Sequence, residues 1–242
     1  MPRDVHVCVF AKAPRPGVVK TRLAEAIGAD QAAELATAFL ADTWAAVARL
    51  PWARPIAALD AASAPGLPAT TGRAEIWLQG RGDLGARIER VLRRALRALP
   101  FAIALGADTP GLPRRLLERA RAELRRSDAV LGPARDGGFY LLGLRRCPPG
   151  LLRGLTWSRA DTFERTRDRL QERGLTVSLL PGWFDIDRPA DLTRMRALLD
   201  AGEIRAASTA RVLRRLRDAN DHEVALGAST RGPIRRPRQL DR

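Results

Sequence analysis

The two lysines of this chain lie close together, in one short segment near its start. Lys12 and Lys20 are its only lysines, although lysine and arginine together account for 42 of the 242 residues. An ammonium is a compact point charge that suits a phosphate oxygen, and Arg22 adds a third cation close by. The segment therefore predicts a binding site for a diphosphate. Two surface lysines that happen to be neighbours are the alternative interpretation.

The sequence around these cations, F-A-K-A-P-R-P-G-V-V-K-T-R-L, is typical of a loop between a strand and a helix. Pro14 and Gly17 prevent a helix and force an irregular turn, whose backbone N–H groups can point inward. Thr21 follows Lys20 where a helix opens, and a helix N-terminus attracts phosphate. Connections of this kind are usually only ~2–6 residues long, so a longer, cationic one indicates function. The segment is not a Walker A loop, because Val19 stands where that pattern requires glycine.

Asp108 follows an apolar run in the segment L-G-A-D-T-P. A strand that ends there would deliver a single carboxylate to the edge of a sheet. Mg²⁺ is usually held by one or two carboxylates, and substrate phosphates and waters complete its ligands. We therefore expect Asp108 to bind Mg²⁺ or Mn²⁺. Capping of the next helix is the alternative, but that helix begins only near Pro113.

A second acidic segment, W-F-D-I-D-R-P-A-D, contains Asp185 and Asp187. In an extended chain the period of two puts both carboxylates on one face. Paired carboxylates repel each other unless a cation lies between them, so we expect this pair to contribute to the metal site. Asp191 instead fits a helix cap, because Pro189 suits the first helical turn and Arg188 is an unfavourable N-cap.

The segment Q-G-R-G-D-L-G, residues 79–85, directly follows an expected strand. Gly82 allows close approach of the backbone to a ligand, and Gln79 and Asp83 offer groups that can read a base or a ribose. A turn in which Asp83 caps the next helix is an equally good interpretation.

The segment G-P-A-R-D-G-G-F-Y contains an acid and two glycines before two aromatic residues. Gly137 and Gly138 suit a loop that wraps around a ligand, and Asp136 is a candidate general base for an acceptor hydroxyl. Asp-Gly followed by apolar residues is also a strong hairpin signal, and both interpretations can hold together.

Short apolar runs and amphipathic stretches alternate along the chain, which predicts an α/β fold with a mainly parallel central sheet and helices on both faces. In such sheets ligands lie beyond the carboxyl ends of the strands, where the segments above are expected. The predicted strands are Val5–Phe10, Pro55–Leu59, Glu75–Leu78, Phe101–Leu105, Ala129–Leu131, Phe139–Leu144 and Val177–Leu180. The predicted helices after the first loop are Asp30–Leu50, Leu84–Leu99, Pro113–Arg126, Ala160–Arg173 and Ala190–Leu199.

The net charge of +15 does not by itself indicate a nucleic-acid partner. Arginines are spread over nearly every expected helix and alternate with acidic residues, and no nucleic-acid-binding signature is visible. The first residues lack the apolar core that a signal peptide would have, and no apolar run approaches the ~20 residues of a membrane span. Its two cysteines offer no disulfide framework, and Cys8 lies in an apolar run. We therefore expect a cytoplasmic protein with no specific nucleic-acid partner and no membrane span.

Taken in order, these five segments resemble those of the small bacterial GT-A-fold proteins known as arsenosugar-biosynthesis-type glycosyltransferases. The resemblance covers roughly Val5 to Leu199, and the family is similar to the nucleotidylyltransferases that activate molybdopterin or phospholactate. It implies a single GT-A domain over residues 1–202, with the diphosphate of a nucleotide sugar over the first loop and a divalent metal on Asp108. A basic helix over residues 203–217 and a disordered basic tail over 218–242 are expected to follow.

The leading hypothesis from sequence is metal-dependent transfer of a sugar from a nucleotide sugar to a small-molecule acceptor. The alternative is a nucleotidylyltransferase, which joins an NTP to a phosphorylated small molecule and releases pyrophosphate. In either case Lys20 is expected to act in catalysis by stabilising developing negative charge.

Overall fold

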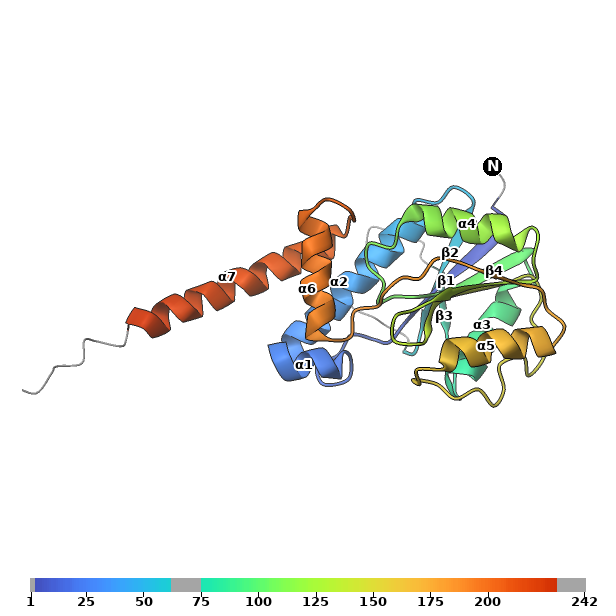
Figure 1. Cartoon of the computed structure of the whole chain (residues 1–242), viewed down its shortest axis with the longest axis horizontal. Helices are drawn as coiled ribbons and strands as arrows, with labels where there is room; N and C mark the ends of the chain where they lie inside the picture. Colours follow the sequence, from blue (N-terminus) through green and yellow to red (C-terminus); the bar gives the residue numbers. More distant parts are fainter. Residues whose placement is uncertain (1–2, 62–74, 230–242) are drawn as a thin grey trace, which may run out of the picture.

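The computed structural model describes residues 3–61 and 75–229, with backbone alone beyond residue 218. A seven-stranded sheet in the order β3-β2-β1-β4-β6-β5-β7 forms the centre of the fold (Figure 1). The predicted α/β class is confirmed, and each predicted strand is present to within two residues at either end. The strands are β1 (Val5–Ala11), β2 (Ala53–Leu59), β3 (Glu75–Leu78), β4 (Phe101–Gly106), β5 (Ala129–Pro133), β6 (Phe139–Leu144) and β7 (Val177–Leu179).

The sheet is mainly parallel, and β6 is the exception. β1 pairs in parallel with β2 and β4, β2 with β3, and β5 with β7, whereas β6 runs antiparallel between β4 and β5. β1 is buried on both sides because helices cover both faces of the sheet, which explains its continuous apolar run. Cys8 in this strand is fully buried, as expected for a small apolar residue.

Helices cover the two faces in pairs, α2 and α4 on one face and α3 and α5 on the other (Figure 1). Leu40, Trp44 and Val47 of α2 pack with the odd-numbered valines of β1. Ile88 and Leu92 of α3 pack with Cys8 on the opposite face. The helices are α1 (Thr21–Ile27), α2 (Ala29–Ala48), α3 (Leu84–Ala95), α4 (Arg114–Leu124), α5 (Thr162–Glu172), α6 (Pro189–Asp200) and α7 (Ala207–Ser229).

A third apolar cluster joins α1, α2, α6 and α7 at one end of the sheet (Figure 1). Leu23 of α1, Phe39 of α2 and Met195 of α6 are buried in it. This cluster fixes the first helix and the last two helices to each other. Phe184 and Ile186 also belong to the cluster, so it packs against the segment that carries Asp185 and Asp187.

Helix α7 starts later and continues further than its sequence pattern predicted. Asp42 of α2 accepts hydrogen bonds from the backbone N–H groups of Ser208 (2.9 Å) and Thr209 (2.7 Å), and so caps α7 from a neighbouring helix. The expectation of a tail from residue 218 is wrong for residues 218–229, which are helical. No proline lies between Ala207 and Pro233, so nothing in that stretch forces the helix to end at residue 217. Residues 230–242 of the expected tail lie outside the described residues.

Among the described residues, no helix has both the length and the apolar character that a bilayer crossing requires.

Candidate active site

The ends of two neighbouring strands bring Asp108 beside the first loop. β1 and β4 run in parallel with Phe10 opposite Gly106, and the N–H of Ala107 donates to the carbonyl of Phe10 (3.0 Å). The chain thus leaves both strands at the same point of the sheet. Asp108 follows directly after this last hydrogen bond, at the carboxyl edge where the sequence pattern predicted it.

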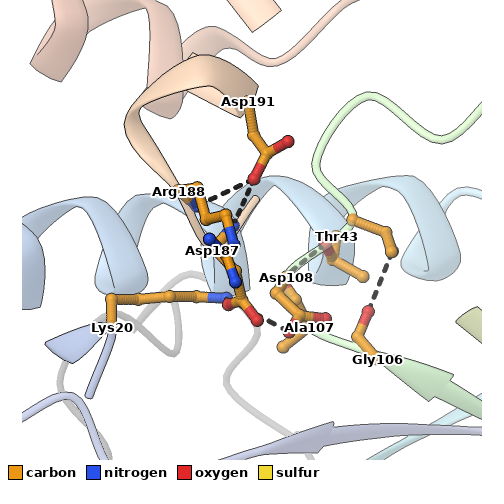
Figure 2. A network of polar contacts seen from close by, with 9 residues as sticks. Lys20, Thr43, Gly106, Ala107, Asp108, Asp187, Arg188 and Asp191 are labelled. Atoms are coloured by element: carbon orange, nitrogen blue, oxygen red, sulfur yellow. Dashed lines mark hydrogen bonds and ion pairs between the residues drawn. The ribbon is translucent and has the colours of Figure 1, made fainter. Parts of the chain in front are cut away.

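Two buried hydroxyl groups hold the turn that carries Asp108 (Figure 2). The hydroxyl of Thr109 donates to the carbonyl of Gly106 (2.9 Å), and that of Thr43 donates to the carbonyl of Ala107 (3.1 Å). Thr43 lies in the last two turns of α2, and nothing in the sequence around it distinguishes it from other helix residues. Sequence reasoning therefore missed this positioning residue.

The segment after β7 crosses the sheet edge and reaches Asp108. The N–H of Trp183 donates to Pro133 at the end of β5 (3.0 Å), and the N–H of Ile186 donates to the carbonyl of Asp108 (3.1 Å). Phe184 and Ile186 are buried, whereas Asp185 between them is half-buried. The predicted alternation in this extended segment is therefore confirmed, and its carboxylates lie on the side away from the apolar core.

Asp108, Asp185 and Asp187 form a carboxylate triad at this edge. Each offers an oxygen, and these oxygens lie within 4.8 Å of one another. Burial raises the pKa of Asp185 to about 7, and the negative charges of Asp108, Asp136 and Asp187 add to the effect. Three hard oxygen donors whose charges repel one another fit a divalent cation such as Mg²⁺ or Mn²⁺.

Lys20 connects the first loop to this triad (Figure 2). Its Nζ donates to Asp187 Oδ1 (2.5 Å) and to Asp108 Oδ2 (3.2 Å), and its side chain is only 10% exposed. Burial lowers the pKa of this ammonium, but the two carboxylates outweigh burial and raise the pKa above its usual value. The residue has a left-handed backbone (φ 49°, ψ 43°), which is unfavourable for lysine. Such strain is typical of functional positions.

Asp191 holds the segment that carries Asp187. Its carboxylate accepts hydrogen bonds from the N–H groups of Arg188 (2.8 Å) and Asp187 (3.1 Å) at the start of α6 (Figure 2). The capping interpretation of Asp191 is confirmed. The two bonds give the backbone N–H groups of Asp187 and Arg188 an acceptor at the start of α6, whose N-cap residue, Arg188, is an unfavourable type for that position.

The other predicted residues of the first loop differ in their exposure and backbone conformation. Lys12, Thr21 and Arg22 are exposed, Pro14 is buried and Gly17 has a positive φ of 74°. Lys12 and Arg22 form no ion pair with any described residue, so both cations are available to a ligand.

A carboxylate that sequence reasoning missed holds this loop. The N–H of Ala13 donates to Asp60 at the end of β2 (2.7 Å). Because parallel strands end at one edge, the position of Asp60 after an apolar strand was a usable signal.

The residues after β3 that were predicted to contact a base or a ribose form hydrogen bonds within the protein. Gln79 is 3% exposed, and its amide donates to the carbonyls of Ala11 (3.0 Å) and Ala58 (2.8 Å). Asp83 accepts from the N–H of Ala86 (2.8 Å) and caps α3, as the alternative interpretation held. Gly82 has φ 111°, which this turn requires of it. The structure therefore does not support Gln79 as a residue that reads the nucleotide, because its amide already bonds to the sheet.

The segment around Asp136 forms the hairpin turn between β5 and β6. Asp136 Oδ1 accepts from the N–H of Gly138 (2.8 Å), and the N–H of Ala134 donates to the carbonyl of Gly138 (2.9 Å). Gly137 has φ 88°, and a Cβ on it would lie 2.1 Å from the carbonyl oxygen of Ala160. Asp136 is exposed and close enough to the triad to raise the pKa of Asp185. The hairpin interpretation is confirmed, and the carboxylate of Asp136 remains open to a ligand.

Comparisons with known proteins agree with this fold. The model of the DUF2064 family, described as an uncharacterized protein conserved in bacteria, matches residues 27–159. A crystal structure from Desulfovibrio desulfuricans G20, provisionally described as a nucleotide-diphospho-sugar transferase, superposes with a TM-score of 0.78. It is 30% identical to this chain, and the match covers 93% of this chain and 98% of that one. No curated protein matches the sequence.

Two further structures share the fold at lower identity. CMP:2-keto-3-deoxy-manno-octonic acid synthetase complexed with CTP has a TM-score of 0.50 at 12% identity, over 82% of this chain and 99% of that one. 4-Diphosphocytidyl-2C-methyl-D-erythritol synthase has a TM-score of 0.52 at 13% identity, with the same coverage of 82% and 99%. At these identities the likeness extends to the fold alone.

Proposed function

The chain belongs to the DUF2064 family of bacterial proteins, and from this premise we propose that it is a glycosyltransferase that depends on a divalent metal. It would move a sugar from a nucleotide sugar to a small-molecule acceptor. One observation carries the proposal: Lys20 of the cationic first loop is ion-paired with Asp108 and Asp187 of the triad. A cation suited to phosphate and three carboxylates suited to a divalent metal thus lie together at the carboxyl edge of the sheet, which supports the proposal.

The triad would hold Mg²⁺ or Mn²⁺, which when bound neutralises charge on a diphosphate leaving group. Lys20, Lys12 and Arg22 would bind the diphosphate oxygens by direct charge-assisted hydrogen bonds. These contacts strengthen as negative charge develops on the leaving group, which is where electrostatic stabilisation lowers the barrier.

Asp136 would accept a proton from the acceptor hydroxyl. The hydroxyl oxygen attacks the anomeric carbon of the donor, the bond from that carbon to the diphosphate oxygen breaks, and the nucleoside diphosphate leaves. The proton of the hydroxyl passes to the Asp136 carboxylate. The exposure of Asp136 and its position near Asp185 support this role.

Nucleotidyl transfer is the second candidate, because the fold occurs in a synthetase complexed with CTP. An oxygen of a phosphorylated acceptor would then attack the α-phosphorus of an NTP, and pyrophosphate would leave. Lys20 and the triad would stabilise phosphate charges in this reaction as well, so the two candidates are distinguished by their products.

Calorimetry tests nucleotide binding, with nucleoside diphosphates and triphosphates in the presence and absence of Mn²⁺. We expect at least one nucleotide to bind, and to bind more tightly with the metal. Release of a nucleoside diphosphate from a nucleotide sugar would then favour glycosyl transfer, and release of pyrophosphate from an NTP would favour nucleotidyl transfer. If no nucleotide binds under either condition, both candidates are wrong.

A further inference from the structure

Lys20 contacts the same carboxylates that we assign to the metal. Its Nζ lies 2.5 Å from Asp187 Oδ1 and 3.2 Å from Asp108 Oδ2. The third carboxylate, Asp185, has an oxygen within 4.8 Å of theirs. The ammonium is nearly buried whereas Asp108 and Asp187 are partly open to solvent, so an incoming cation meets oxygens that already have a positive partner.

A divalent cation and this ammonium would compete for these oxygens. Mg²⁺ binds its oxygen ligands at about 2.0–2.1 Å. A metal that shared both oxygens with Nζ would lie only about 3–4 Å from it, a distance at which the charges +1 and +2 repel strongly in a poorly solvated site. A metal that takes these two oxygens would therefore displace the ammonium from them.

We propose that Lys20 is an internal counter-ion for Asp108 and Asp187, which the metal displaces and the diphosphate of the donor then receives. The inference rests on the proposed function and adds to it the order in which the metal and the diphosphate engage the site. Metal alone must strip the ammonium of its partners, whereas metal that arrives with a diphosphate supplies new ones. The metal and the diphosphate therefore bind with positive coupling, and that coupling passes through one side chain.

The lysine side chain suits this exchange. Its ammonium is carried on a flexible four-carbon stem, and its three donors can turn to a new acceptor while the backbone stays in place. The backbone of Lys20 is itself anchored, because its carbonyl accepts from the N–H groups of Leu23 and Ala24 (both 2.9 Å) at the start of α1. Only the side chain has to move between the carboxylates and the phosphates.

The presence of only two lysines makes the exchange directly observable. Protein labelled with ¹⁵N-lysine gives at most two ammonium signals, and a Lys12→Met variant assigns them. We expect Mg²⁺ alone to shift the Lys20 signal and to leave that of Lys12 unchanged. Subsequent inorganic pyrophosphate, which probes the diphosphate without a choice of base, should shift the Lys20 signal again.

Metal affinity provides the second test, by calorimetry with Mn²⁺. Lys20→Met should bind Mn²⁺ about tenfold or more tightly than the wild type, because a charge-assisted competitor is gone. Lys20→Gln, which keeps hydrogen-bonding capacity without the charge, should also bind more tightly and covers the case in which the methionine variant does not fold. Arg188→Met is the matched control: it removes an exposed positive charge next to Asp187 and should change the affinity less than about threefold.

Equal or weaker Mn²⁺ binding by both Lys20 variants would overturn the proposal, as would an unshifted Lys20 signal at Mg²⁺ concentrations that saturate the site. The proposed function fails separately. If Mn²⁺ binds more tightly to the Lys20 variants but no nucleotide or pyrophosphate binds to any form, the counter-ion role stands and the transferase assignment falls.

Discussion

The candidate site is rich in acidic residues, whereas the chain as a whole is strongly basic. The protein has a net charge of +15, yet three carboxylates gather at one edge of its sheet. Burial and the acidic neighbours of Asp185 raise its pKa to about 7. Lys20 compensates the other two. We propose that the three carboxylates of this site hold either the Lys20 ammonium or a divalent cation.

Replacement of Asp108 by asparagine should weaken Mn²⁺ binding at least tenfold. The change removes one of three charged ligands, while Lys20 keeps its shorter contact with Asp187. The melting temperature should change little, because the side chain of Asp108 is 39% exposed. Calorimetry with Mn²⁺ measures the effect, with Asp200→Asn, an exposed acid at the end of α6, as the control. Equal affinities in both variants would remove Asp108 from the metal site.

The pKa of Asp185 predicts how stability depends on pH in the absence of metal. Between about pH 4 and pH 7 the native protein keeps a proton on Asp185 that the unfolded chain has lost. The unfolded state then binds fewer protons, so this group lowers the free energy of unfolding as pH rises through that window. We expect the free energy of unfolding, measured by urea denaturation in the presence of a chelator, to fall more between pH 5 and pH 8 for the wild type than for Asp185→Asn. The same loss in both proteins would contradict the assignment.

At the scale of elements, carboxylates hold several helices at their N-termini. Asp83 caps α3 within its own turn, Asp191 caps α6, and Asp42 caps α7 from the adjacent α2. The cap on α6 also fixes Asp187, and so connects a structural bond to the candidate site. In the sequence, an acidic residue beside a glycine-containing turn can therefore be a helix cap or a ligand contact, and only its hydrogen-bond partners show which it is.

Replacement of Asp83 by alanine separates these meanings. As an N-cap, Asp83 should contribute about 1 kcal/mol to the free energy of unfolding, measurable by urea denaturation. Its loss should leave nucleotide binding within about twofold of the wild type, because its carboxylate bonds to Ala86. Asp83→Asn, which retains capping ability, should recover most of the stability. A variant of unchanged stability and much weaker nucleotide binding would restore the interpretation of Asp83 as a ligand contact.

At the scale of the whole molecule, arginines lie on most of the described helices. Many of them form ion pairs with acids on the same helix or close by, such as Arg114 with Glu118 and Arg165 with Asp161. Such pairs lie at the surface and contribute little stability individually. The high positive charge therefore comes largely from arginines on the helices, and the carboxylate triad at the edge of the sheet contrasts with it.

We expect DNA to bind only weakly and without sequence preference. Fluorescence anisotropy with a labelled duplex should show binding at about 20 mM salt that is largely lost at about 150 mM, because such binding rests on released counter-ions. The Lys20→Met variant should behave as the wild type does. Tight binding at the higher salt, or a clear preference for one sequence, would point to a nucleic-acid partner instead.

The sequence by itself determined the elements and the kinds of chemistry they carry. Apolar runs and helical periodicity predicted the strands and most helices, since such patterns depend on neighbours within a turn or a pleat. The first loop with its two lysines, Asp108 after an apolar strand, and the alternation around Asp185 were visible for the same local reason.

Only the tertiary structure decided which of these residues meet. Lys20 and Asp187 are 167 positions apart, and their contact depends on the strand order and on a segment that crosses the sheet edge to Asp108. The burial of Gln79 and the antiparallel insertion of β6 were likewise undetermined by local pattern. Packing between distant elements sets such relations, and no local spacing encodes them. The sequence therefore predicted a phosphate-binding loop and three acidic residues, and the fold brings them together through the contacts of Lys20.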